Sequence, residues 1–243
     1  MIAVIIQART GSTRLPGKVM KELCGKTVLA HDIERVSQAK MVDEIIIATT
    51  THDSDDVIVQ EAERLGVKVF RGSEDDVLSR YYFAAKEAEA DVVVRITSDC
   101  PLIDPVILDD IIRVFLDGSY DIVTNAGNDL SKRTFPRGLD AEVFSFEMLE
   151  TAHLKAVETY QREHVTPYIY ENAKSVFYYQ NDVDYSKYRW TLDTEEDWLL
   201  ISEIYQRLYH GEHNFYFKDI LSVMEENPEL YNINKDIEQK KLK

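Results

Sequence analysis

Several features that define specialised protein classes are scarce in this sequence. Its 243 residues include only two cysteines, Cys24 and Cys100, which are too few for a disulfide framework and lack the spacing of metal ligands. No apolar run approaches the ~20 residues that a membrane-spanning helix needs. Residues 1–6 are too short for the apolar part of a signal peptide, and no basic segment precedes them. These absences favour a cytoplasmic protein with free thiols and no membrane contact.

Basic residues are also in the minority. The chain carries 28 Lys and Arg against 44 Asp and Glu, which gives a formal net charge of −16. At a pI near 4.8 the protein would repel a nucleic-acid backbone, and this argues against general nucleic-acid binding. The length suits one large α/β domain or two small ones, and we expect a single domain over residues 1–243.

One short stretch runs against this acidic background. Residues 2–6 form an apolar run without alternation, which is typical of a buried strand in a parallel sheet. The loop that follows, residues 7–18 (QARTGSTRLPGK), holds Arg9, Arg14 and Lys18 among glycine and hydroxyl residues, and it contains no acid. Backbone N–H groups and guanidinium groups at the carboxyl end of a first strand can bind phosphate oxygens. The loop therefore predicts a polyphosphate site, whereas the simpler interpretation is a solvated basic turn.

Two familiar phosphate loops do not fit this stretch. A Walker A loop needs four residues between its first Gly and the Gly-Lys pair, but five separate Gly11 from Gly17. Pro16 interrupts the loop, and Val19 stands where the metal-binding hydroxyl would be. The dinucleotide pattern G-x-G-x-x-G is absent, so a different kind of phosphate loop is expected.

The first half of the chain alternates between strand and helix patterns. Strands are predicted at 2–6, 44–49, 67–70 and 91–97, and helices at 27–40, in the segment ending near 65–66, and up to about residue 90. We expect Thr27 to cap the first helix and Asp104 to cap a helix that starts at Pro105. The alternation predicts an α/β fold with a doubly wound, mostly parallel sheet, in which ligands bind beyond the carboxyl ends of the strands.

The second half is less regular. The pattern indicates strands at 121–125, 175–180 and 189–192, and helices at 146–158, 160–172, 194–209 and 218–226, followed by a charged tail, 234–243, that we expect to be frayed. Pro167 would either begin a new turn or kink its helix. Thr194 and Asp197 form a capping box at the start of the helix that follows residue 193. Residues 120–185 are interpreted as an inserted region for an acceptor and for dimerisation.

Two aspartates stand where predicted strands end. Asp99 follows the strand at 91–97, and Pro101 fixes the turn after it; Asp193 directly precedes the Thr194 cap. Asp99 could instead be a turn residue or an N-cap, and Asp193 an acid placed favourably at a helix start. Because a bound triphosphate needs a divalent cation, we favour a metal-binding role for Asp99. Thr194 and Glu195 already satisfy the helix start, so Asp193 is free for other work, and we favour a metal-binding role for it as well.

The loop at 7–18 resembles the first motif of the sugar-nucleotide cytidylyltransferases, which include CMP-Kdo synthetase, CMP-sialate synthetase and, most closely, the spore coat polysaccharide type. The motif A-R-x-x-S-x-R-L-P-x-K is matched by Ala8, Arg9, Ser12, Arg14, Leu15, Pro16 and Lys18. The resemblance implies the nucleotide-diphospho-sugar transferase fold and a Mg²⁺-dependent transfer of CMP from CTP to a sugar hydroxyl, with release of pyrophosphate. It also implies an acidic acceptor of the nonulosonate or Kdo type, a role in surface polysaccharide or glycan biosynthesis, and a homodimer.

The same resemblance assigns residues to roles. The implied catalytic residues are Arg9, Arg14, Lys18 and Asp99, and the implied metal ligands are Asp99 and Asp193. The implied nucleotide contacts are Ala8, Arg9, Gly11, Ser12, Thr13, Lys18, Arg71, Gly72, Ser73, Arg80 and Asp99. The residues from 71 to 80 also have a purely structural interpretation. Ser73 with Asp76 can form a helix cap, and Arg80 can pair with Asp76 four residues away. Nothing at 71–73 selects cytosine over uracil.

The acceptor region has the weakest pattern. The predicted acceptor contacts are Arg137, Asp140, His164 and Arg189. Arg137 suits a carboxylate or phosphate because a planar guanidinium binds such anions through two donors, but it could also be a surface arginine beside Asp140. His164 could equally be structural.

Two other functions remain open. A glycosyltransferase of the same fold would use a D-x-D pair, whereas Ser98-Asp99-Cys100-Pro101 supplies one Asp. A catalytically silent nucleotide-binding protein would bind CTP without turnover.

Overall fold

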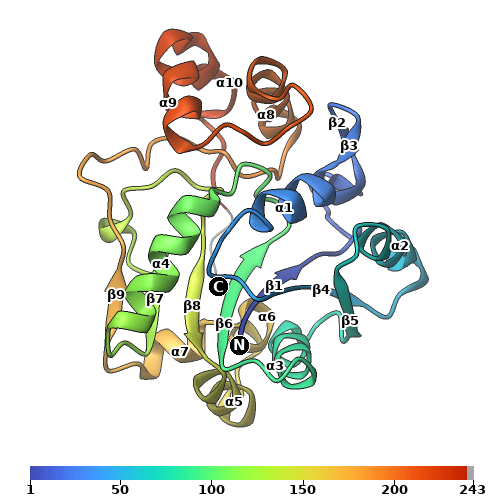
Figure 1. Cartoon of the computed structure of the whole chain (residues 1–243), viewed down its shortest axis with the longest axis vertical. Coiled ribbons are helices and arrows are strands. Elements are labelled where there is room, and N and C mark those ends of the chain that lie inside the picture. The colour runs from blue at the N-terminus through green and yellow to red at the C-terminus, as the bar shows by residue number, and fades with distance from the viewer. Residues whose placement is uncertain (240–243) are drawn as a thin grey trace.

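The computed structural model describes residues 1–239 and contains one seven-stranded sheet with helices on both faces (Figure 1). The strand order is β5-β4-β1-β6-β8-β7-β9, and in this sheet of the described residues β8 alone runs antiparallel to its neighbours. The strands are β1 (Ile2–Gln7), β4 (Glu44–Thr50), β5 (Lys68–Gly72), β6 (Val92–Thr97), β7 (Ile122–Thr124), β8 (Glu142–Ser145) and β9 (Val176–Tyr178). The predicted doubly wound, mostly parallel α/β fold is confirmed.

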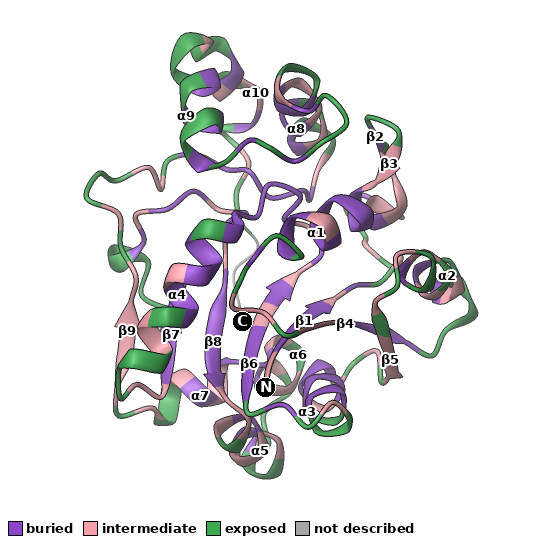
Figure 2. Cartoon of the chain, viewed as in Figure 1, coloured by how far each residue is buried: buried purple, intermediate pink, exposed green. Residues whose placement is uncertain are grey.

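The central strands are apolar on both sides because both faces of the sheet are covered. In β1, Val4 and Ile6 belong to one hydrophobic cluster, and Ala3 and Ile5 belong to another on the opposite face. Helices α1, α2 and α4 contribute to the first cluster, and α3 and α5 contribute to the second. Figure 2 shows β1, β6 and β8 buried between these layers, while β5 and β9 at the sheet edges are less buried. This double burial explains the continuous apolar run at the start of the chain.

The helices follow the sequence patterns closely. They are α1 (Val28–Val36), α2 (Asp56–Arg64), α3 (Val77–Glu87), α4 (Pro105–Asp117), α5 (Phe146–Lys155), α6 (Thr159–His164), α7 (Pro167–Asn172), α8 (Glu195–Leu208), α9 (Phe217–Glu226) and α10 (Tyr231–Asn234). Three predicted caps are confirmed: Thr27 accepts from Ala30 N, Asp104 accepts at the start of α4, and Thr194 forms a capping box with Asp197. Pro167 begins α7 and does not kink a longer helix.

The chain order places a topological switch point beside β1. From β1 the chain builds β4 and β5 on one side, and it then crosses to β6 on the other side. The loops after β1 and β6 therefore leave the sheet at its topological switch point, where open α/β sheets bind their ligands. The stretch 120–185 supplies β7, β8 and β9 to the same sheet.

The predicted strand at 189–192 is wrong. In this segment the backbone makes a single bridge, between Arg137 and Arg189, and then turns to a different partner, because Leu192 N donates to Asp99 O at 2.8 Å. Gly138 permits the close approach: at φ 100° its Cβ position would lie 2.4 Å from the carbonyl carbon of Trp190. A segment that bonds to two loops in turn cannot form a continuous ladder, although its residues favour strands.

The C-terminal tail also differs from the prediction. Asn234, the first residue of the stretch expected to be frayed, is 3% exposed and donates two hydrogen bonds. Residues 240–243 of that prediction lie outside the described residues. A short hairpin, β2 (Glu22–Leu23) and β3 (Lys26–Thr27), was not predicted. Both cysteines are free thiols, and no described helix is long and apolar enough to cross a membrane.

Candidate active site

Three loops that lie far apart in the sequence meet at the ammonium group of Lys18. Lys18 begins a 3₁₀ turn, Lys18–Met20, directly after Gly17, which adopts φ 65°. Its Nζ lies 3.0 Å from Asp99 Oδ2, 2.7 Å from Asp193 Oδ1 and 2.8 Å from the carbonyl oxygen of Leu192. The two aspartates that the sequence singled out as metal ligands therefore converge on one cation at the switch point of the sheet.

The charges of this cluster stabilise one another. Burial alone would raise the pKa of Asp99, but the charge of Lys18 and a hydrogen bond from Thr97 outweigh it and hold that pKa at about 2. Burial alone would lower the pKa of Lys18, but the charges of Asp99 and Asp193 raise it above its usual value. Around neutral pH, Asp99 is therefore ionised and Lys18 is protonated.

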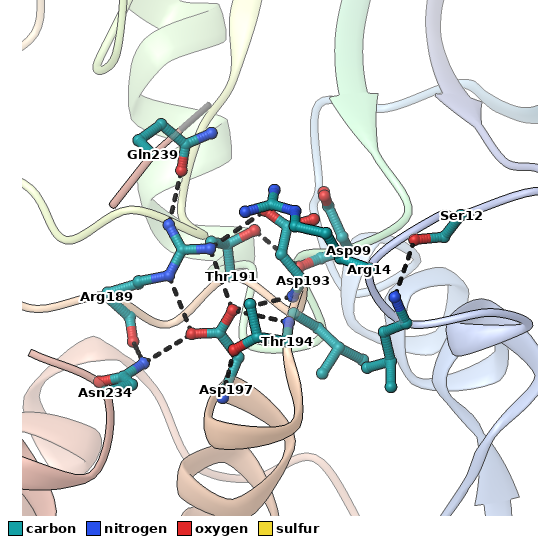
Figure 3. Close-up of polar contacts among 12 residues, drawn as sticks. Ser12, Arg14, Asp99, Arg189, Thr191, Asp193, Thr194, Asp197, Asn234 and Gln239 are labelled. Carbon is teal, nitrogen blue, oxygen red and sulfur yellow. Dashed lines mark hydrogen bonds and ion pairs between the residues drawn. The ribbon is translucent and has the colours of Figure 1, made fainter. Parts of the chain in front are cut away.

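Two arginines contact the carboxylate oxygen of Asp193 that does not face Lys18 (Figure 3). Asp193 Oδ2 lies 2.9 Å from Arg14 Nη2 and 3.1 Å from Arg189 Nη2. Arg189 also donates to both carboxylate oxygens of Asp197, at 2.9 and 3.0 Å, and Asp197 is fully buried at the start of α8. Asp197 was predicted as a cap, but its pairing with Arg189 was not.

Arg189 was predicted to contact the acceptor. The structure places it 6% exposed, with donors directed at Asp193, Asp197 and Gln239. Among the described residues this geometry makes it a support for Asp193, and contact with an acceptor stays a prediction.

The loop at 7–18 is fixed by a residue that the sequence did not single out. Thr10 donates from both its N and Oγ1 to Asp55 Oδ1, at 2.8 and 2.7 Å. Burial would raise the pKa of Asp55, but hydrogen bonds from Thr50 and Thr10 lower it overall. Asp55 lies in the polar run after β4, and position alone does not distinguish it from its acidic neighbours there.

The predicted phosphate-binding residues lie at different depths in this loop. Ala8 is buried, Ser12 is half-buried and accepts from Leu15 N at 3.4 Å, and Gly11 and Thr13 are exposed. The loop is thus anchored at its start and open to solvent at its turn.

Arg9 links this loop to the predicted base-binding region. Its Nη1 lies 2.9 Å from Glu74 Oε1, and the other oxygen of Glu74 lies 2.8 Å from His52 Nε2. A Cβ at Gly11 would lie 3.7 Å from the same carboxylate. The segments at 9–11 and 71–74 are therefore neighbours, as the resemblance implied, although they are more than 60 residues apart in the sequence.

Within that region the four predicted contacts have different surroundings. Arg71 donates to the carbonyl oxygens of Thr50 and His52 and pairs with Asp56 at 2.6 Å. Arg80 is 2% exposed, its Nη1 lies 3.5 Å from Ala48 O, and its Nε has no hydrogen-bond partner among the described residues. Arg80 is thus a buried cation packed beside the ends of the strands, and Arg71 braces the loop after β4.

Of the two structural interpretations for residues 71–80, the helix cap is found and the ion pair between Arg80 and Asp76 is not. Asp76 itself caps α3 by accepting from Ser79 N, and Ser73 Oγ accepts from Asp76 N. Asp76 pairs with Arg162 at 2.7 Å, so the predicted pair with Arg80 does not form. Gly72 lets Arg80 pack closely, because a Cβ there would lie 2.8 Å from Arg80 Cγ.

The predicted acceptor residues include an arginine without a counter-ion. Arg133 forms a two-fold ion pair with Asp140, with both distances at 2.8 Å. Arg137 is half-buried and makes no side-chain hydrogen bond or ion pair among residues 1–239. Burial lowers its pKa, as do the charges of Arg133 and Arg189, against the opposing charge of Asp140. Such a guanidinium suits an anion supplied from outside.

His164 ends α6 and is half-buried. The next residue, Val165, adopts φ 71°, and Thr166 and Tyr170 then donate to Glu142, which pairs with Arg95 at 2.6 Å. The turn is therefore anchored to the sheet, and contact of His164 with an acceptor stays a prediction.

Asp32 is a further buried acid near the cluster. It is fully buried on α1, and neither carboxylate oxygen has a hydrogen-bond partner among the described residues. Burial and the charge of Asp99 raise its pKa well above the usual value. The sequence carried a signal for it, because Asp32 lies four residues from both Val28 and Val36, on the apolar face of the helix.

Comparison with known proteins shows the family. A family profile described as cytidylyltransferase matches residues 3–237. An uncharacterized protein of Methanocaldococcus jannaschii is 42% identical over 97% of this chain and 95% of its own length. The spore coat polysaccharide biosynthesis protein SpsF of Bacillus subtilis is 33% identical, over 94% of this chain and 95% of its own.

Two further matches extend this picture. The 3-deoxy-manno-octulosonate cytidylyltransferase of Geobacter sulfurreducens is 35% identical over 46% of this chain and 44% of its own. A solved cytidylyltransferase from Leptospira borgpetersenii superposes with a TM-score of 0.88 at 37% identity, and covers 99% of both chains. The chain therefore belongs to the cytidylyltransferase family, and it is a nucleotidyltransferase.

Proposed function

We propose that this enzyme transfers CMP from CTP to the hydroxyl of an acidic sugar and releases pyrophosphate, with Mg²⁺ as cofactor. The observation that carries the proposal is the convergence of Lys18, Asp99 and Asp193 at the switch point of the sheet. Names of relatives support it, since one is a 3-deoxy-manno-octulosonate cytidylyltransferase and another a spore coat polysaccharide biosynthesis protein. We further propose that the reaction belongs to surface polysaccharide or glycan biosynthesis and that it takes place in the cytoplasm.

The donor set fits a magnesium ion. Asp99 and Asp193 present oxygens within 3.0 Å of a single positively charged atom, Lys18 Nζ, so both carboxylates can face one cation. Among the described residues no group of three or more His, Cys, Asp or Glu side chains is arranged to hold a metal. Mg²⁺ is often held by one or two carboxylates together with substrate phosphates and water. When bound, it would offset phosphate charge and lower the pKa of the attacking hydroxyl.

The cations of the loop at 7–18 would bind the triphosphate. Arg9 is paired with Glu74, Arg14 with Asp193, and Lys18 with both Asp99 and Asp193. Phosphate oxygens would replace part of these partners, and the positive charges would stabilise the charge that develops on the leaving pyrophosphate. The reaction needs no covalent intermediate, since the sugar hydroxyl itself attacks the α-phosphorus.

Arg137 is the proposed contact for an anionic group on the acceptor. It is the half-buried guanidinium without a counter-ion described above, and its neighbour Arg133 is already neutralised by Asp140. A carboxylate on the sugar would supply the missing charge through a two-donor contact.

We also propose that the enzyme is a homodimer that uses residues 120–185. Large apolar side chains are exposed in this stretch, among them Leu130 at 61%, Leu154 at 73% and Val157 at 82%. Light scattering coupled to gel filtration measures the molar mass, and a monomer at micromolar concentration would exclude this part of the proposal.

The activity is tested by a substrate screen. CTP, UTP, ATP and GTP are each combined with acidic and neutral sugars and Mg²⁺, and pyrophosphate release is measured. We expect release from CTP with an acidic sugar. Release of a nucleoside diphosphate from a nucleotide sugar would instead identify a glycosyltransferase, and protection by CTP against heating without turnover would identify a silent nucleotide-binding protein.

A further inference from the structure

The C-terminal segment packs against the residues that hold Asp193, namely Arg189 and Asp197. Asn234, at the end of α10, is 3% exposed, and its Nδ2 donates to Arg189 O at 2.9 Å and to Asp197 Oδ1 at 2.8 Å. Beyond it, Gln239 Oε1 accepts from Arg189 Nη1 at 2.5 Å. Figure 3 shows both side chains beside Arg189, on the side away from Arg14.

The group that Asn234 contacts determines where Asp193 lies. Asp197 Oδ2 accepts from the backbone nitrogens of Asp193 and Thr194, at 3.0 and 3.1 Å. Arg189 Nη2 bridges this oxygen to Asp193 Oδ2, at 3.0 and 3.1 Å. Both the main chain and one carboxylate oxygen of Asp193 are therefore set by the buried Arg189–Asp197 pair.

A buried ion pair keeps its geometry only when its remaining hydrogen-bonding groups are also satisfied. Asn234 meets this need on two sides at once, because one amide group joins the carbonyl of Arg189 to the carboxylate of Asp197. It thereby connects the segment before Asp193 to the helix after it.

We propose that Asn234 is a positioning residue, through which the C-terminal segment 231–239 fixes Asp193 for the reaction. This inference rests on the proposed function for its catalytic consequence, but its structural part, the placement of Asp193 by Arg189 and Asp197, does not. Asn234 touches neither Lys18 nor Asp99, so it acts on the site through Arg189 and Asp197.

The test compares Asn234→Ala and Asn234→Asp with a matched control, Asn227→Ala. Asn227 lies in the same C-terminal region, and its Nδ2 donates to Val223 O at 2.8 Å and not to Arg189 or Asp197. Asn234→Asp keeps the shape but replaces the donor with a negative charge facing Asp197. Asn234→Gln keeps the amide donor and serves as the conservative variant.

The first measurement is hydrogen–deuterium exchange of residues 191–198 without ligand. We expect exchange of the Asp193 and Thr194 amides to rise about tenfold in Asn234→Ala and more in Asn234→Asp, with partial recovery in Asn234→Gln and no change in Asn227→Ala. Unchanged exchange in Asn234→Ala and Asn234→Asp would overturn the proposal, whether or not the enzyme transfers CMP to an acidic sugar.

The second measurement is kinetic and follows the magnesium dependence. We expect Asn234→Ala to lower kcat and to raise the half-saturating Mg²⁺ concentration, each by about 10-fold or more, with the KM for CTP within about twofold. The Mg²⁺ concentration needed for CTP to raise the melting temperature should rise in parallel. If Asn234→Ala only lowers the melting temperature and leaves both Mg²⁺ curves unchanged, the residue is structural and the proposal fails.

Discussion

Lys18 shows how much of this site depends on a single side chain. Its side chain is 12% exposed and its ammonium group contacts two aspartates, so Lys18 stabilises both carboxylates and they stabilise Lys18 despite the loss of water. Asp99 contributes stability above its unfolded pKa, and this contribution disappears as the pH falls through about 2 in the folded state. Removal of Lys18 would leave Asp99 without its ion-pair partner beside Asp193, which Arg14 and Arg189 still contact.

Lys18→Met keeps most of the side-chain volume and removes the charge. We expect it to lower kcat by about 10²–10³, because a preorganised positive charge opposite the leaving pyrophosphate is lost, and the same loss is expected for Asp99→Asn. Steady-state pyrophosphate release measures this. Lys21→Met is the control, since Lys21 lies 3.7 Å from Glu195 and contacts neither aspartate. Undiminished release in Asp99→Asn would count decisively against the proposed function.

Arg137→Ala tests the proposed contact with the acceptor sugar and should leave CTP binding unchanged. We expect the KM for an acidic acceptor to rise about 10- to 100-fold, because a charge-assisted hydrogen bond contributes roughly 1.5–3 kcal/mol. The KM for CTP should stay within about twofold. Arg113→Ala, which removes an exposed arginine paired with Asp110, is the matched control. An equal loss with acidic and neutral sugars would contradict an anion contact.

At the scale of elements, two histidines join α1 to the segment between α8 and α9. His31 Nδ1 lies 2.8 Å from His213 Nε2, and His31 Nε2 lies 2.6 Å from the carbonyl oxygen of Leu23. This carbonyl requires a proton on His31 Nε2, so His31 Nδ1 accepts from His213. Burial, together with the charges of Arg35, His31 and Lys26, lowers the pKa of His213 to about 3, although Glu34 lies 3.3 Å from its Nδ1.

This histidine pair predicts an acid-labile contact. His213 stays neutral when folded but binds a proton when unfolded below a pH of about 6.5, so stability falls as the pH drops from ~6.5 towards 3. The loss is at most about 1.4 kcal/mol per pH unit for this group. Urea unfolding between pH 7 and 4 measures the slope, which should be shallower in His213→Gln and unchanged in His210→Gln, where the histidine is exposed. Equal slopes in wild type and His213→Gln would exclude the effect.

At the scale of the whole molecule, the site joins parts of the chain that belong to different layers. The loop at 7–18 follows β1, Asp99 follows β6, and Asp193 precedes α8, so the Lys18 cluster ties the N-terminal half of the sheet to the C-terminal helices. A ligand that replaces Lys18 as a bridge would hold the same parts together.

CTP with Mg²⁺ should therefore stabilise the whole fold. At a CTP concentration of 100 times the Kd, linkage gives about 2.7 kcal/mol, which corresponds to roughly 5–10 °C in melting temperature for a chain of this size. Differential scanning fluorimetry measures the shift. Lys18→Met should lose most of it, and Lys21→Met should keep it. A shift that is the same without Mg²⁺ would argue against a metal-bridged triphosphate.

The sequence by itself determined those features that depend on near neighbours. Continuous apolar runs specified buried parallel strands, and the caps at Thr27, Asp104 and Thr194 followed from side chains within three residues of the groups they bond. The cationic loop at 7–18 could be recognised because it contains no acidic residue, whereas the chain as a whole is strongly acidic. The segment at 189–192 was misassigned because its partners, Arg137 and Asp99, are distant in the sequence.

Only the tertiary structure decided which charges meet. Lys18 is separated from Asp99 by 81 residues and from Asp193 by 175, and their convergence depends on the order in which the strands assemble. For the same reason Asp76 pairs with Arg162, 86 residues away, and not with Arg80 on its own helix. Ion pairs between loops depend on the order of the strands and on burial, and no local sequence pattern encodes either. For the same physical reason, the contact of Asn234 with Arg189 and Asp197 is seen only in the folded chain.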